Sequence, residues 1–237
     1  MTTVSPLPSL SRAARSASTA PVRARSAGDA GTGFQSPRIP PPVTPAEMEV
    51  RSDAEHCELI DGQLVEKTMS LESSWIGGEV LRVLGNLTRE QNLGWVFGSD
   101  CAFRCFDWDR DRVRKPDVSF VSRFKLPERR FLGGFCEIVP DLAVEVISTH
   151  DIASEVETKI EEYLRAGVRA VWVIHPQNRL IEVFRGNGEI RRLHEQDFLT
   201  DEELFPGWRH PVAEFLPLPV VATPAAIAQQ PATVTEP

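Results

Sequence analysis

Residues 140–174 read PDLAVEVISTHDIASEVETKIEEYLRAGVRAVWVI, and the pattern predicts a strand, a helix and a second strand in succession. The first apolar run, 142–147, is rich in valine and too short for a free-standing helix, which favours a buried strand. A polar turn follows, then a helical segment over 155–166 that Gly167 can terminate, and a second apolar strand over 170–174. This succession indicates an α/β (α+β) fold.

Glu145 stands in the middle of the first strand, between Val144 and Val146. An ionised carboxylate inside a packed strand costs on the order of several kcal/mol unless a metal or another cation compensates its charge. The two valines leave Glu145 no obvious route to solvent. Glu145 is therefore the first candidate for a functional residue.

The composition is that of a globular protein. The 237 residues are 41% hydrophobic and 25% charged, which suffices for one medium domain with a core. No stretch approaches the roughly 18 uninterrupted apolar residues of a membrane span, so we expect none. The four cysteines show neither CxxC spacing nor a neighbouring histidine cluster, which disfavours a zinc site and favours reduced thiols in a cytoplasmic protein.

Charge is divided unevenly along the chain. The net charge is −8, yet residues 1–45 carry five arginines and one aspartate. Net acidity disfavours a nucleic-acid partner without excluding one, because bulk charge does not decide whether a local groove holds phosphate. Residues 1–45 and 217–237 are rich in small residues and proline, so we expect disordered extensions around a folded 46–216. The Arg- and Ser-rich N-terminus also resembles an organelle transit peptide, which stays open as an alternative.

The remaining folded sequence predicts a hairpin, a helix and further strands. Residues 57–66, CELIDGQLVE, place apolar residues on both sides of the two-residue turn signal Asp61-Gly62, and they predict an N-terminal β-hairpin. Between residues 69 and 92, apolar residues recur at three- and four-residue spacing, as in one amphipathic helix. Further strands are predicted at 95–97, 101–106, 117–121, 180–184 and 189–193.

Asp117 opens a strand after Lys115-Pro116, and Glu145 lies in the next predicted strand. Carboxylates on adjacent strands can share a divalent metal, which prefers hard oxygen ligands, and we expect their carboxyl groups within roughly 4–6 Å of each other. Lys159, on the following helix, could reach back toward a phosphate or an attacking water. These residue types together suit metal-assisted cleavage of a phosphodiester, with a cation to stabilise the transition state.

Five segments carry a family resemblance. They are CELIDGQLVE, VRKPDVSFV, PDLAVEVIS, ETKIEEYLRAGVRAVWVI and LFPG. In this order and spacing they resemble the Uma-type family of predicted restriction endonucleases, within the PD-(D/E)XK nuclease-like superfamily. The resemblance covers about residues 57–216. It implies a restriction-endonuclease-like mixed β-sheet flanked by helices, a Mg²⁺ or Mn²⁺ site, and DNA as the substrate.

The resemblance also implies roles for single residues. Asp117 would be the superfamily's first acid and Glu145 its second, both as metal ligands. The lysine expected two residues after the second acid is replaced by Ile147, and Lys159 resembles its migrated substitute. Glu58 matches an acid that the family tends to carry in the first hairpin.

Two further residues are accessory candidates. Alternation places Asp141 on the same strand face as Glu145, where it could help to hold the metal, although a strand-starting residue is the simpler interpretation. Tyr163 lies one helical turn after Lys159 and is expected to pack or orient rather than to react. Lys159 by itself could equally be a solvated helix lysine.

The sequence therefore favours a metal-dependent endonuclease that hydrolyses DNA phosphodiester bonds. The alternative is a non-catalytic nucleic-acid-binding or scaffold protein that retains the nuclease fold, favoured by the missing lysine and the acidic surface. The choice of DNA over RNA, the strandedness of the substrate and the oligomeric state stay open, with a homodimer among the arrangements.

Overall fold

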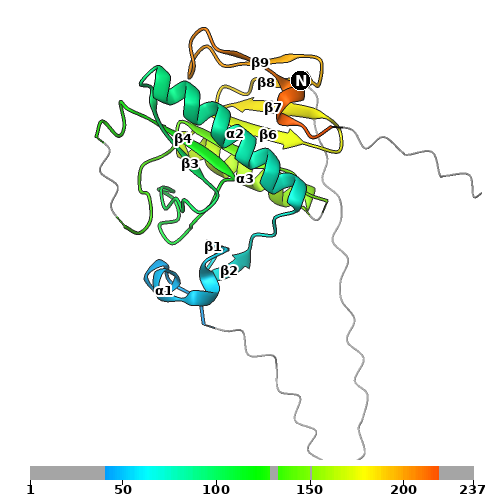
Figure 1. Cartoon of the computed structure of the whole chain (residues 1–237). Coiled ribbons are helices and arrows are strands. Elements are labelled where there is room, and N and C mark those ends of the chain that lie inside the picture. Colours follow the sequence, from blue (N-terminus) through cyan, green and yellow to red (C-terminus); the bar gives the residue numbers. More distant parts are fainter. Residues whose placement is uncertain (1–40, 129–132, 150, 219–237) are drawn as a thin grey trace, which may run out of the picture. The chain divides into compact units, whose positions relative to one another are not determined.

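The protein is described here from a computed structural model that covers residues 41–128, 133–149 and 151–218 (Figure 1). Most of residues 1–45 and 217–237, for which we expect disorder, lies outside the described residues. The folded part begins earlier than the expected residue 46. The amide of Val43 donates a hydrogen bond to the carbonyl of Gly62 at 2.7 Å, and Thr44 caps the first helix, α1 (Pro45–Val50).

A six-stranded mixed sheet is the centre of the domain. In spatial order its strands are β3 (Gly94–Gly98), β4 (Val118–Ser122), β5 (Leu142–Val146), β6 (Ala170–His175), β7 (Leu180–Arg185) and β8 (Ile190–His194). Strands β5 and β6 are parallel, and the other neighbours are antiparallel. The parallel pair needs a crossover, which α3 (Ala153–Ala166) supplies. The predicted α/β class and mixed sheet are confirmed.

A helix covers each face of this sheet. Helix α2 (Leu71–Glu90) packs its buried residues, among them Val80 and Leu84, against β5 residues such as Val144. Helix α3 packs Ile160 against the opposite face, and Figure 1 shows it behind the sheet when α2 is in front. Because side chains alternate along a strand, Val144 faces α2 while Glu145 faces α3.

The predicted N-terminal hairpin is present as β1 (Cys57–Ile60) and β2 (Gln63–Glu66). Asp61 and Gly62 at its turn have φ values of +50° and +74°, as a type I′ turn requires. Leu59 exchanges two backbone hydrogen bonds with Val113, of 3.0 and 2.9 Å. These bonds tie the hairpin to the segment that leads into β4. A short 3-10 helix, η1 (Ser52–Ala54), precedes the hairpin.

The C-terminal part adds a second small sheet of β9 (Phe198–Thr200) and β10 (Arg209–Pro211), followed by the 3-10 helix η2 (Val212–Phe215). The strand predicted at 101–106 is wrong. In that segment Phe103 alone forms bridges, one to Arg114 and one to Cys136, so no ladder propagates in either direction. None of the described helices combines the length and the apolar character that a bilayer crossing needs.

Candidate active site

A cavity of about 540 Å³ opens between the hairpin, the ends of β4 and β5, and α3. Its lining contains four of the predicted residues: Glu58, Asp117, Glu145 and Lys159. Eight acidic side chains line it against four basic ones, so the cavity has an excess of negative charge. The acids are Glu58, Asp61, Glu66, Asp117, Glu145, Asp151, Glu155 and Glu162, and the bases are Lys67, Arg112, Arg114 and Lys159.

Asp117 and Glu145 meet because β4 and β5 run antiparallel. Val118 pairs with Val144, so the residues before and after this pair are neighbours, and the amide of Asp117 donates to the carbonyl of Val144 at 2.9 Å. Asp117 Oδ2 accepts the amide of Val146 at 2.7 Å, which fixes its carboxylate over the end of β5. Both acids are buried, at 6% and 5% exposure.

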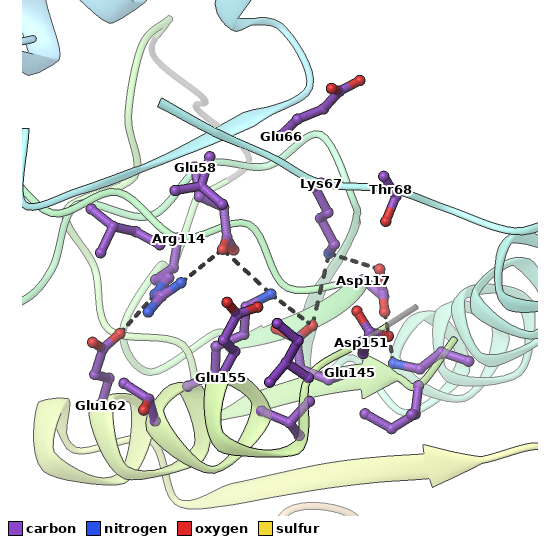
Figure 2. Close-up of a pocket in the computed structure, with 18 of the residues that line it drawn as sticks. Glu58, Glu66, Lys67, Thr68, Arg114, Asp117, Glu145, Asp151, Glu155 and Glu162 are labelled. Carbon is purple, nitrogen blue, oxygen red and sulfur yellow. Dashed lines mark hydrogen bonds and ion pairs between the residues drawn. The ribbon is translucent and has the colours of Figure 1, made fainter. Parts of the chain in front are cut away.

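A lysine that the sequence argument missed lies between these two carboxylates. Lys67, directly after β2, places its Nζ 2.7 Å from Asp117 Oδ1 and 3.9 Å from Glu145 Oε2. Figure 2 shows its side chain reaching from the hairpin toward both acids. Asp117 and Glu145 therefore share one cation, although that cation is a side chain.

Lys159 approaches the same site from α3. Its Nζ lies 3.3 Å from Glu58 Oε2 and 3.6 Å from Glu145 Oε2. Glu58 also receives Arg114 at 2.8 Å and the amide of Lys115 at 2.9 Å. Burial alone would raise the pKa of Glu58, but the charges of Lys159 and Arg114 bring it below its ordinary value. Glu58 is thus an ionised partner for Lys159.

Glu145 is held by Tyr163, whose hydroxyl donates to Oε1 at 2.9 Å. Burial raises the pKa of Glu145 above its ordinary value, although the charges of Lys159 and Lys67 oppose this. Burial and the Glu145 charge raise the pKa of Tyr163 well above its usual range, so the tyrosine remains a donor. For Lys159, burial lowers the pKa, yet Glu145 and Glu58 raise it overall, so the lysine remains a cation. The charges of Lys159 and Lys67 therefore favour the ionised form of Glu145, against the effect of burial.

Asp141 lies outside the cavity, at the opposite end of β5. It precedes Glu145 by four residues, or roughly 13 Å along an extended strand. Its Oδ2 accepts the amide of Ser122 at 2.8 Å, and its Oδ1 lies 3.1 Å from Lys125 Nζ. Because Asp141 is not part of the cavity lining, we do not propose a metal role for it.

A buried chain of ion pairs extends from Glu58 toward α3. Arg114 binds Glu58 with one guanidinium nitrogen, and its Nε donates to Glu162 on α3 at 2.7 Å. Arg112 also pairs with Glu162 and, at 2.7 Å, with Asp61 at the hairpin turn. Sequence reasoning missed these ion pairs, because their members come from three separate segments: the hairpin, the segment before β4, and α3.

The chain is similar to known proteins in both sequence and fold. The family model Uma2, described as "Putative restriction endonuclease", matches residues 45–218. The chain belongs to the Uma2 family. Among solved structures, one similar chain is a putative nuclease belonging to DUF820 from Anabaena variabilis ATCC 29413, with 21% sequence identity and a TM-score of 0.61. The alignment covers 73% of this chain and 97% of that one, so the two chains share a fold. No curated protein matches in sequence.

The acidic pair of this Uma2 chain fits a divalent metal by its chemistry. Asp117 Oδ1 and Glu145 Oε2 already face one cation, and Mg²⁺ is commonly held by one or two carboxylates together with substrate phosphates. Among the described residues, no three His, Cys, Asp or Glu side chains are grouped to hold an ion by themselves. Asp117 and Glu145 are the carboxylates of this site that face one common cation.

Proposed function

We propose that this Uma2 protein is a metal-dependent endonuclease that hydrolyses DNA phosphodiester bonds, with Mg²⁺ or Mn²⁺ held by Asp117 and Glu145. The observation that carries the proposal is that both carboxylates face one cation in a cavity where Lys159 stands 3.6 Å from Glu145. A divalent ion would supply positive charge to the phosphate and activate the attacking water. The family description supports nucleic acid as the substrate.

The chain's own residues have distinct roles in this proposal. Lys159 places a permanent cation where negative charge grows on a phosphate oxygen, which is the form of stabilisation that most lowers such a barrier. Glu58 positions that ammonium at 3.3 Å. Tyr163 orients Glu145 through its hydroxyl and leaves Oε2 directed at the cations.

The charge of the cavity explains why a metal would be needed. Eight acidic and four basic side chains would repel a phosphodiester, since like charges at short range in a partly buried site interact strongly. A divalent ion held by Asp117 and Glu145 would reduce that excess and would place positive charge where the phosphate must enter. All four cysteines are free thiols, which supports the cytoplasm as the proposed compartment.

A cleavage assay tests the proposal. The full chain is incubated with single- and double-stranded DNA and with RNA, in Mg²⁺, in Mn²⁺ and in chelator. We expect the protein to cleave DNA when Mg²⁺ or Mn²⁺ is present and not in chelator. Glu145→Gln should lose cleavage, whereas Glu161→Gln, a change at an exposed position on α3, should cleave normally. Cleavage that persists in chelator, or in Glu145→Gln, would contradict the metal-site assignment.

One observation favours the non-catalytic alternative. Lys67 and Lys159 already neutralise the acidic pair, so the fold can keep these carboxylates buried without any metal. A protein that binds nucleic acid in the same assay, yet never cuts it in Mg²⁺ or Mn²⁺, would establish this alternative.

A further inference from the structure

We propose that Lys67 competes with the divalent metal for Asp117 and Glu145, and so sets the metal affinity of the site. This inference rests on the metal-dependent function proposed above. It concerns a residue outside the predicted set of acids and lysine, on the hairpin rather than on the sheet or α3.

Lys67 is fixed in the site and not merely near it. Its Nζ is 2.7 Å from Asp117 Oδ1, and it also donates to the carbonyl of Lys115 at 2.5 Å. Its side chain is 13% exposed, so the ammonium has exchanged most of its water for these oxygens. A charge removed from water in this way is stable only with close compensating partners.

The two carboxylates offer the same oxygens to Lys67 and to a metal. Asp117 Oδ2 is engaged by the amide of Val146, and Glu145 Oε1 by the hydroxyl of Tyr163. This leaves Oδ1 and Oε2 to face the cavity, and both face Lys67. A divalent ion bonded to Oδ1 at the usual distance of about 2.0–2.6 Å would meet an ammonium already in contact with that oxygen. Two cations cannot share this position, so one excludes the other.

Lys159 differs from Lys67 in its partners. Lys159 has Glu58, which is held by Arg114 and Lys115 and is not a proposed metal ligand, so it can remain in place when an ion enters. In the part of the chain that the structure describes, the acidic partners of Lys67 are Asp117 and Glu145, the two proposed metal ligands. When Lys67 leaves, it can turn toward other acids of the cavity lining, Glu66, Asp151 and Glu155 (Figure 2).

Manganese binding to the full chain without nucleic acid tests this competition. Free Mn²⁺ is measured by electron paramagnetic resonance for the wild type, Lys67→Gln, Lys67→Met and Lys125→Gln. Lys125 pairs with Asp141 outside the cavity, so its variant removes the same unit of charge elsewhere. We expect both Lys67 variants to bind Mn²⁺ about tenfold more tightly or better, as the loss of a competing contact cation predicts. Lys125→Gln should bind like the wild type.

The site of binding is checked in the Lys67→Gln background, where adding Asp117→Asn should remove the tight binding. Circular dichroism confirms that each variant is folded. The strongest support would be measurable Mn²⁺ binding by Lys67→Gln and none by the wild type, because Lys67 would then prevent metal binding completely. Equal affinity in wild type and Lys67→Gln overturns the competition and leaves the proposed function intact. Failure of every variant to bind Mn²⁺ overturns both.

Discussion

Glu145 is compensated by cations from two elements that are distant in the sequence. Lys67 comes from the hairpin and Lys159 from α3, and they lie 3.9 and 3.6 Å from the same oxygen, Oε2. Burial favours the protonated acid, while these two charges favour the carboxylate. The chemistry of the site therefore depends on which of the two lysines only compensates the buried charge of Glu145 and which also takes part in the reaction.

Lys159→Ala should reduce turnover while leaving nucleic-acid affinity nearly intact. Its ammonium is proposed to act on charge that develops in the transition state, and loss of one such contact commonly costs on the order of 10²–10³ in rate. Single-turnover cleavage and a separate binding titration measure the two effects. Lys125→Ala is the control, since it also removes one lysine charge. Cleavage by Lys159→Ala at the wild-type rate would show that the migrated-lysine assignment is wrong.

The sequence reveals some of these residues and conceals others for physical reasons. Glu145 could be found because a charge between buried valines conflicts with its local environment. Asp117 followed from its place at the start of the neighbouring strand. Lys67 carries no such signal, because a lysine after a hairpin strand is ordinary in sequence, and only the position of the hairpin on the sheet brings it to Asp117.

At the scale of elements, the hairpin and α3 are joined by the buried pairs around Arg114. Arg114 connects Glu58 of β1 with Glu162 of α3, and both its carboxylate partners are buried. Lys159 lies on the same helix as Glu162, so the pairing also determines how α3 presents that lysine to the cavity.

Glu162→Gln should lower the melting temperature. Removing the charge leaves Arg112 and Arg114 under-compensated in a buried site, which we expect to cost about 2–3 kcal/mol, or roughly 5–10 °C for a domain of this size. Thermal unfolding followed by circular dichroism measures the change. Glu161→Gln, exposed on the adjacent position, should melt like the wild type. If both variants melted alike, the Arg114 pairing would not hold the hairpin to α3.

Element prediction succeeded where the signal was local. The hairpin and both long helices have clear periodicity and turn or capping residues, and their observed bounds differ little from the expected ones. The segment at 101–106 has a strand-like composition, but within it Phe103 alone forms β-bridges, to Arg114 and to Cys136. A local sequence pattern cannot predict such isolated bridges. The short strands β9 and β10 pair with each other across a loop and likewise depend on tertiary contacts.

At the scale of the whole molecule, the described domain extends beyond the boundaries expected from composition. The Thr44 side chain accepts the amide of Glu47, whose carboxylate binds back to the Thr44 amide at 2.7 Å. At the other end, Arg179 donates to the carbonyl of Pro217 at 2.9 Å. Composition marked both ends as extensions because proline and small residues dominate them, yet these few residues contact the domain through backbone groups.

A chain of residues 41–218 should therefore have the same melting temperature as the full chain, and a chain of residues 46–216 should have a lower one. The shorter chain loses the Thr44 cap, the bond from Val43 to Gly62 and the bond from Arg179 to Pro217. A lost N-cap and lost hydrogen bonds cost about 1 kcal/mol each, which for this size corresponds to roughly 5–10 °C. Two further chains show which end causes the loss of stability: 46–218 lacks only the N-terminal contacts, and 41–216 lacks only the bond from Arg179 to Pro217. If 41–218 itself melted below the full chain, residues outside it would have to pack on the domain. If 46–216 melted with the full chain, these terminal contacts would contribute nothing to folding, and the boundary expected from composition would suffice.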